Sequence, residues 1–271
     1  MPYIKIKDKN LYYREYGEGD VLVFLNGMMM STTSWSPFIK FFSSEYKILL
    51  VDLIDQGRSD KADTFYTQDM HVEMLKDIFE KLGYHKVHLI GTSYGGEIAQ
   101  LFTLKYKDMV RSLILSNTTS YTDEYIKKVE KEWYQLAEAH DDNLFLNTVI
   151  SSVYSENFYK ENIKWIEGNK KQIKRILDKE WYKSFMRGII STYDFNVNNQ
   201  LNQIRIPTLV ISSDLDTVIP MKYQQIIYEK IPLSRWIVIK DSGHASIYEK
   251  PYEFMLVVLG FLKTMDFKLN K

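Results

Sequence analysis

The sequence contains no cysteine. This absence excludes a disulfide framework, a thiolate metal site and a cysteine nucleophile, and it is compatible with a reducing cytoplasm. A net charge is also lacking, because 35 Lys and Arg residues balance 35 Asp and Glu residues. Such a chain has no overall field that would attract nucleic acid or an anionic membrane surface. We therefore expect a cytoplasmic protein that binds neither.

Long hydrophobic segments are missing as well. The longest apolar run, residues 254–262, is far too short to span a bilayer, and the first residues alternate between apolar and charged without the apolar centre of a signal peptide. Internal repeats, low-complexity tracts and Gly/Ser-rich linkers are absent too. With 45% hydrophobic and 26% charged residues, the composition is that of an ordinary globular protein.

Short apolar runs alternate with helical patterns along most of the chain. The predicted strands are residues 3–7, 11–16, 21–25, 46–53, 87–90, 110–116, 208–211 and 236–239. Helices are predicted over residues 67–82, ending at Gly83, and over residues 95–106. Continuous apolar strands between amphipathic helices indicate an α/β fold whose mostly parallel sheet is covered on both faces.

One region departs from this alternation. Residues 121–203 show only helical patterns and are rich in charged and aromatic residues. Because strands resume afterwards, we interpret this region as a helical cap on a core formed by residues 1–120 and 204–271; a separate helical domain is the alternative. Its densest basic cluster, residues 170–175, is predicted to form a solvated helix face.

A Gly-x-Ser-x-Gly pattern, Gly91-Thr92-Ser93-Tyr94-Gly95, follows the predicted strand 87–90 and precedes a predicted helix. The pentapeptide alone is weak evidence, but a strand before it and a helix after it strengthen it. A sharp turn between strand and helix exposes the serine oxygen, and the glycines are needed where side chains would collide with neighbouring elements. Free N–H groups at the helix start also lie near a developing negative charge. Ser93 is therefore the candidate nucleophile.

A serine nucleophile needs an adjacent base, and that base needs an orienting acid. The strand–turn–helix arrangement predicts the chain order serine, acid, histidine. His140 and His244 are the histidines after Ser93; His140 lies in the helical region and is expected on the surface. His244 follows the last predicted strand, in a loop of the kind that holds sites in open α/β proteins, and is the candidate base. Either Asp214 or Asp216 supplies the acid, and spacing alone leaves both open.

Taken together, five blocks in this order resemble the α/β-hydrolase superfamily, over nearly the whole chain. They are residues 25–28 (oxyanion loop), 52–60 (glycine-containing loop), 82–96 (helix, strand and nucleophile turn), 207–220 (acid segment) and 243–251 (histidine block). The resemblance implies the α/β-hydrolase fold with an all-helical cap insertion, and alignment on Pro220 places the acid at Asp216. Asn26 stands where the family usually has histidine, and Ser213 where it has glycine.

The resemblance also implies a mechanism. Ser93 would attack a carbonyl, His244 would take the proton, and Asp216 would hold the imidazole. The backbone N–H groups of Met28 and Tyr94 would bind the oxyanion, and neither a metal nor a cofactor is needed.

The substrate is less well defined by sequence. Asn26, Gly27, Met29 and Met30 are candidate pocket residues, since methionine side chains adapt to varied apolar ligands. With the aromatic helical region, they favour a serine esterase or thioesterase acting on a small to medium apolar acyl substrate. Two alternatives stay open: a C–C bond hydrolase or lyase on the same scaffold, and a ligand-sensing or partner-binding protein with slow turnover. The sequence carries no indication of the oligomeric state.

Overall fold

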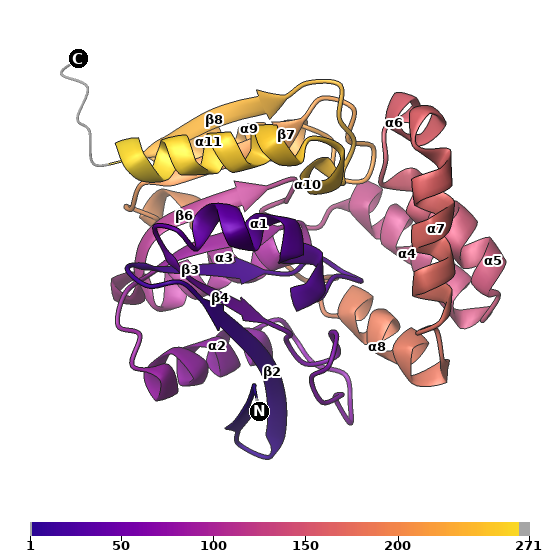
Figure 1. Cartoon of the computed structure of the whole chain (residues 1–271), viewed down its shortest axis with the longest axis horizontal. Coiled ribbons are helices and arrows are strands. Elements are labelled where there is room, and N and C mark those ends of the chain that lie inside the picture. Colours follow the sequence, from indigo (N-terminus) through magenta and orange to yellow (C-terminus); the bar gives the residue numbers. More distant parts are fainter. Residues whose placement is uncertain (1, 266–271) are drawn as a thin grey trace.

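A twisted sheet crosses the centre of the computed structural model, which describes residues 2–265 (Figure 1). Its eight strands run in the order β1-β2-β4-β3-β5-β6-β7-β8. Their bounds are β1 Tyr3–Ile6, β2 Lys9–Tyr16, β3 Val21–Leu25, β4 Lys47–Val51, β5 Val87–Thr92, β6 Val110–Ser116, β7 Thr208–Ser213 and β8 Ser234–Ile239. The pairs β1–β2 and β2–β4 are antiparallel, and all other neighbours are parallel. The α/β fold with a mostly parallel sheet is thereby confirmed.

The central strands are buried on both faces because helices cover both. All five residues of β3 are buried, and its Val23 pairs with Leu49 on one side and Leu89 on the other. Helices α2 (Asp69–Leu82), α3 (Tyr94–Lys105) and α9 (Lys222–Lys230) contribute to the apolar core on one face. Helices α1 (Ser36–Phe42), α10 (Ser246–Glu249) and α11 (Pro251–Thr264) contribute to the core on the other.

Most predicted elements differ from the observed ones only at their ends. Helix α2 ends as predicted at Gly83, whose φ of 75° is the left-handed conformation that glycine adopts readily. The strand predicted over residues 46–53 ends at Val51; the Asp52 N–H still bonds to the Tyr12 carbonyl of β2, and its side chain accepts hydrogen bonds from the N–H groups of Thr32 and Arg58. Helix α1 was not predicted at all. Residues 266–271 of the predicted core lie outside the described residues.

Between β6 and β7 the chain forms only helices, apart from one isolated bridge, and we call residues 121–203 the helical insertion. Its helices are α4 (Glu124–Glu138), α5 (Asp142–Phe145), a π-helix (Leu146–Ile150), α6 (Glu156–Glu161), α7 (Ile163–Lys174) and α8 (Lys179–Ile190), followed by a short turn (Leu201–Gln203). Figure 1 shows α4 to α8 beyond the carboxyl ends of the parallel strands. Aromatic side chains form a separate apolar core there.

The basic cluster of α7 is not uniformly solvated. The Lys170 side chain is only 6% exposed, and its Nζ donates hydrogen bonds to Tyr159 Oη, Asn147 Oδ1 and Glu167 Oε1. The prediction of a solvated face is therefore wrong for Lys170, since neighbouring helices of the insertion cover that part of α7.

Candidate active site

Ser93 lies in the turn between β5 and α3, with φ 49° and ψ −122°. A positive φ is strained for a serine and persists only where the surrounding structure enforces it. Neither flanking glycine could carry a side chain. A Cβ on Gly91 would lie 2.3 Å from the carbonyl oxygen of Gly95, and a Cβ on Gly95 would lie 2.4 Å from the carbonyl oxygen of Leu25. The local sequence thus places the serine hydroxyl at the carboxyl end of a central strand.

His244 and Asp216 meet Ser93 from two later loops. His244 Nε2 is 3.0 Å from Ser93 Oγ, and His244 Nδ1 is 2.8 Å from Asp216 Oδ2. The Asp216 side chain is fully buried, and its other oxygen accepts the N–H groups of Val218 and Ile219 at 2.9 Å. The structure therefore brings together the three residues expected to form a triad, in hydrogen-bonding contact and in the expected chain order.

The other candidates for acid and base lie elsewhere. The Asp214 carboxylate is 3.6 Å from Lys240 Nζ, whereas it is the Asp216 carboxylate that contacts the His244 imidazole. His140 is exposed at the end of α4, where its Nδ1 is 2.8 Å from the Glu138 carbonyl oxygen. Geometry thus singles out Asp216 where the spacing of residues could not.

Asn117, directly after β6, is a further polar residue at this site, and its part was not predicted. It is fully buried with φ 47°, a left-handed conformation that asparagine tolerates better than most residues. Its Nδ2 donates to Asp216 Oδ2 at 2.9 Å, and its Oδ1 accepts from Ser246 Oγ at 3.1 Å. Asn117 therefore connects the acid loop to the segment that follows His244.

The loop after β3 is held by the side chain of Asn26. Its Oδ1 accepts the indole N–H of Trp35 at 2.8 Å, and its Nδ2 donates to the Val51 carbonyl and to Gln56 Oε1. Asn26 and Gly27 are both buried, so they lie on the interior side of the loop. The left-handed residue of this loop is Met29, with φ 62°, and not Gly27.

The two backbone N–H groups expected to bind an oxyanion, those of Met28 and Tyr94, have no acceptor within the described part of the chain. Tyr94 is the first residue of α3, so its N–H has no acceptor within the helix. Neither that N–H nor the N–H of Met28 has a hydrogen-bond acceptor among residues 2–265. One group belongs to the first residue of α3 and the other to the loop after β3.

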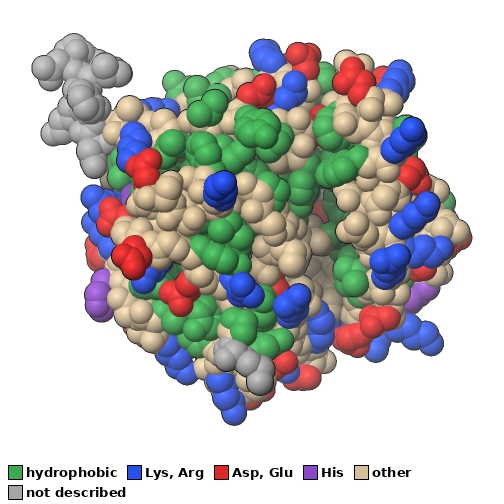
Figure 2. Space-filling view, in the orientation of Figure 1, with side chains coloured by type: hydrophobic (Ala, Val, Ile, Leu, Met, Phe, Trp, Pro, Cys, Tyr) green, Lys and Arg blue, Asp and Glu red, His purple; other side chains and the backbone are tan. Residues whose placement is uncertain are grey.

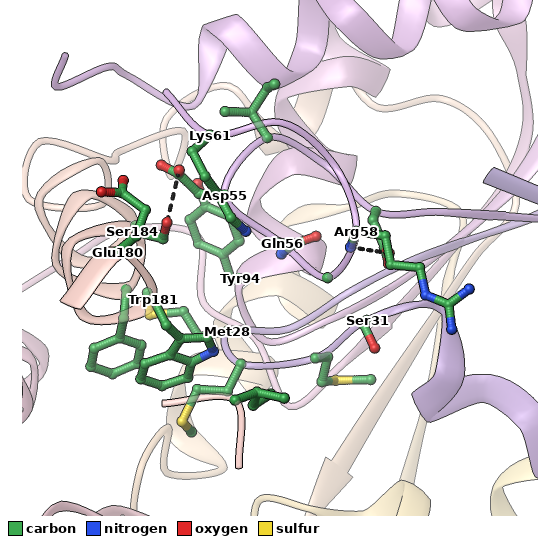
Figure 3. Close-up of a pocket in the computed structure, with 18 of the residues that line it drawn as sticks. Met28, Ser31, Asp55, Gln56, Arg58, Lys61, Tyr94, Glu180, Trp181 and Ser184 are labelled. Atoms are coloured by element: carbon green, nitrogen blue, oxygen red, sulfur yellow. Dashed lines mark hydrogen bonds between the residues drawn. The ribbon is translucent and has the colours of Figure 1, made fainter. Parts of the chain in front are cut away.

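A cavity of about 470 Å³ lies between α8 and the loop that joins β4 to α2. Figure 2 shows the surface hollowed between the core and the helical insertion on this face. The lining includes Met28, Met29 and Met30, with Trp181 and Phe185 from α8 (Figure 3). It reaches the candidate oxyanion residues Met28 and Tyr94, whereas Ser93 is not part of the lining.

The helical insertion is tied to the site by two groups of polar contacts. Glu249 Oε1 accepts the N–H groups of Gly243 and Ser155 at 3.0 Å, and its Oε2 accepts from Ser155 Oγ at 2.6 Å. On the other side, Asp55 receives two hydrogen bonds from the Arg187 guanidinium, at 2.7 and 2.8 Å. Burial alone would raise the pKa of Asp55, but the hydrogen bonds from Arg187 and other donors lower it.

Two carboxyl groups are buried behind the site, between α3 and α4. Burial raises the pKa of Glu130 to about 7 and the pKa of Glu97 well above its ordinary value. Glu97 accepts a hydrogen bond from Gln68 Nε2, and Glu130 accepts one from Thr192 Oγ1. This interface between core and insertion therefore favours protonated carboxyl groups.

Within residues 2–265, no group of three or more His, Asp or Glu side chains is placed to hold a metal ion. Nor does any helix of this part of the chain combine the length and apolarity that a membrane crossing requires.

The family model for the alpha/beta hydrolase fold matches residues 20–251. The chain belongs to this family. The crystal structure of MGS-M2, an alpha/beta hydrolase enzyme from a Medee basin deep-sea metagenome library, is 32% identical, covers 99% of both chains and superposes with a TM-score of 0.95.

Two curated relatives of this hydrolase differ in their reactions. A pimeloyl-[acyl-carrier protein] methyl ester esterase of Wigglesworthia glossinidia brevipalpis is 26% identical over 95% of this chain and 100% of the relative. A proline iminopeptidase of Saccharolobus solfataricus is 26% identical over 96% of this chain and 91% of the relative. The expectation of a hydrolase with the α/β-hydrolase fold is confirmed, while the variety of relatives leaves the substrate unspecified.

Proposed function

We propose that this hydrolase cleaves a carboxylic ester or thioester of a small to medium apolar acyl substrate through an acyl-enzyme on Ser93. The observation that carries the proposal is the chain of contacts from Ser93 Oγ through His244 to Asp216, at 3.0 and 2.8 Å. Hydrogen bonds of this length allow a histidine to take the serine proton while a carboxylate fixes the imidazole. The similarity to a methyl ester esterase supports the choice of an ester.

In the first step, Ser93 Oγ attacks the carbonyl carbon and its proton moves to His244 Nε2. The Asp216 carboxylate stabilises the imidazolium that forms. The carbonyl oxygen becomes an oxyanion that accepts the N–H groups of Met28 and Tyr94; such a donor typically contributes ~100- to 1000-fold in rate. The imidazolium then gives its proton to the leaving alcohol or thiol, and the acyl group stays on Ser93.

In the second step, His244 removes a proton from water as the water attacks the acyl-enzyme. Collapse of the second oxyanion releases the carboxylic acid and returns the proton to Ser93 Oγ. Because Ser93, His244, Asp216, two backbone N–H groups and water supply every proton and hydrogen bond in this scheme, it requires no cofactor.

The apolar part of the cavity supports an acyl substrate. Met28 and Met29 pack against the aromatic core of the insertion, and Trp181 and Phe185 line the same space. Flexible thioether side chains against aromatic rings suit chains of varied shape. A small-molecule substrate and a cytoplasmic location are part of this proposal, with neither nucleic acid nor a membrane as a partner.

The test is the turnover of p-nitrophenyl esters and acyl thioesters of increasing chain length by the wild type and by Ser93→Ala. We expect kcat to fall by on the order of 10⁶-fold, as when a triad serine is removed elsewhere. Ser44→Ala, an exposed serine near the end of α1, is the control and should leave turnover unchanged. Circular dichroism verifies that both variants fold.

Unchanged turnover in Ser93→Ala would refute the proposal. Cleavage of diketone substrates but of no ester, again dependent on Ser93, would reassign the enzyme to C–C bond hydrolysis. Tight retention of a ligand with negligible turnover of every class would favour a sensing role.

A further inference from the structure

The cavity described above has an apolar part and a charged part. Figure 3 shows Met28 and Trp181 on one side, and Lys61 and Asp55 on the opposite side, beside the end of α8. The charged side chains in the lining are Asp52, Asp55, Arg58, Lys61, Asp178 and Glu180. The partners of these groups decide which charge a ligand would meet.

The two aspartates of the core loop are fully engaged. Asp52 accepts the backbone N–H of Thr32 at 2.6 Å and that of Arg58 at 2.9 Å, one at each oxygen. Both oxygens of Asp55 accept hydrogen bonds from Arg187. Each of their oxygens therefore already accepts at least one hydrogen bond from the protein.

The two acids of the insertion are engaged as well. Asp178 precedes α8 and accepts the N–H of Trp181 at 2.7 Å, as a helix cap does. Glu180 pairs with Arg187 at 3.0 Å and with Lys183 at 3.5 Å, one at each oxygen. All four carboxylates of the lining thus have donors of their own.

Lys61 differs from these groups. Within residues 2–265, no carboxylate oxygen lies within 4.0 Å of its Nζ, and its ammonium donates no hydrogen bond. Burial lowers the pKa of Lys61 from its ordinary 10.5, against the charges of Asp55 and Asp52, so the ammonium is partly removed from water. A cation in that condition gains most from an anion placed against it.

We propose that Lys61 binds an anionic group of the substrate, so that the preferred ester carries a carboxylate remote from the scissile bond. The proposal rests on the esterase function proposed above and adds a substrate class to it. The apolar stretch of the substrate lies along Met28 and Trp181, and its carboxylate accepts hydrogen bonds from Lys61 Nζ.

Recognition of this kind is local. The lining holds four acids and two bases, so the cavity as a whole does not attract anions from a distance. The gain comes from contact with one unpaired ammonium, and it is therefore expected in KM for the matched substrate. An overall electrostatic effect would instead favour a cationic substrate, and this reading can be tested directly.

The experiment compares three p-nitrophenyl esters of equal chain length: the hexanoate, the adipate monoester and the ω-trimethylammonio hexanoate. We expect the wild type to prefer the adipate monoester. Lys61→Met should lower kcat/KM for that ester by about 10- to 100-fold, which is the range for a hydrogen bond to a charged group, and leave the hexanoate within about threefold. Lys40→Met, an exposed lysine on α1, is the matched control and should change neither.

An equal loss for the neutral and the anionic ester, or a preference for the trimethylammonio ester, would overturn the proposal. Acetate esters whose alcohol carries the carboxylate show whether Lys61 serves the acyl or the alcohol side. A change in Tm identifies a variant that is merely unfolded.

A binding measurement separates this inference from the proposed function. Calorimetric titration of Ser93→Ala with monoethyl adipate requires no turnover. Weaker binding after Lys61→Met is added supports anion recognition even if no ester is hydrolysed, whereas unchanged binding refutes it.

Discussion

The loops around Ser93 and the interior of the helical insertion are held together by different forces. Asp216 alone accepts hydrogen bonds from Asn117, His244, Val218 and Ile219. Inside the insertion, by contrast, Phe145 and Trp181 pack on Phe185 with ring centroids 5.2 and 5.5 Å apart. Hydrogen bonds fix direction, whereas ring packing tolerates several arrangements. Under the proposed function, the first kind of interaction would position the reacting atoms and the second would enclose the substrate.

The largest expected effect on stability comes from the contact between the core and the helical insertion, where Arg187 pairs with Asp55. Arg187→Met leaves the Asp55 carboxylate, whose side chain is 3% exposed, buried without its cation. Breaking such a pair typically costs about 3–5 kcal/mol, so the free energy of unfolding in urea should fall by that amount. The double variant Asp55→Asn/Arg187→Met should recover part of the loss. If Arg187→Met is as stable as the wild type, the contact between core and insertion does not depend on this pair.

A pH-dependent effect of smaller size is expected where α4 meets α3. The pKa of Glu130 is raised to about 7 from an ordinary 4.5, and its Oε2 has no hydrogen-bond donor among the described residues. Because the folded state favours the protonated form, stability is full below the unfolded pKa and is lost as pH rises through the folded one. At about 1.4 kcal/mol per pKa unit, the loss amounts to at most about 3.5 kcal/mol.

Glu130→Gln should remove the part of this dependence that Glu130 contributes, since an amide keeps the acceptor for Thr192 Oγ1 without a charge, while the contribution of Glu97 remains. Urea unfolding between about pH 4.5 and pH 8 measures the slope. Glu138→Gln, an exposed residue of the same helix, serves as the control. The control should keep the slope of the wild type. An unchanged slope in Glu130→Gln would contradict the assignment.

The smallest expected effects are kinetic, and they differ between the loops around Ser93 and the helical insertion. Asn117→Ala removes the Nδ2 donor to Asp216 and should lower kcat by about 10-fold with little change in KM, equally for every substrate. Asn117→Gly should do the same, and because glycine accepts φ 47° it separates the lost donor from backbone strain.

Trp181→Leu should instead change the ratio of kcat/KM between short and long acyl chains. Selectivity that shifts in the Asn117 variants would remove the distinction.

The sequence predicted those parts of the site whose signals are local. Ser93 lies in a short pattern between a strand and a helix, and His244 lies in the loop that follows β8. Asp214 and Asp216 could not be separated, because only the packing of the loop decides which carboxylate faces the imidazole. The expectation of Asp216 came from a resemblance and not from spacing.

The unpredicted features depend on partners far apart in the chain. Asn117 contacts Asp216 across 99 positions, and Arg187 contacts Asp55 across 132 positions. Helical periodicity assigns the Lys170 cluster to a solvated face, yet neighbouring helices cover Lys170. The eight strands were all predicted, since apolar continuity is a property of each strand alone, whereas the packing within the insertion depends on contacts that no short window contains.

The attachment of Glu249 to both Gly243 and Ser155 has a practical consequence for exchanging parts between relatives. A backbone N–H of the insertion and one of the histidine loop share a single carboxylate oxygen, and the Ala245 N–H also bonds to the Val153 carbonyl. A chimaera that receives a foreign insertion must therefore retain residues 153–155, or the loop that carries His244 loses these hydrogen bonds. The natural exchange boundary runs inside the insertion and not at its ends.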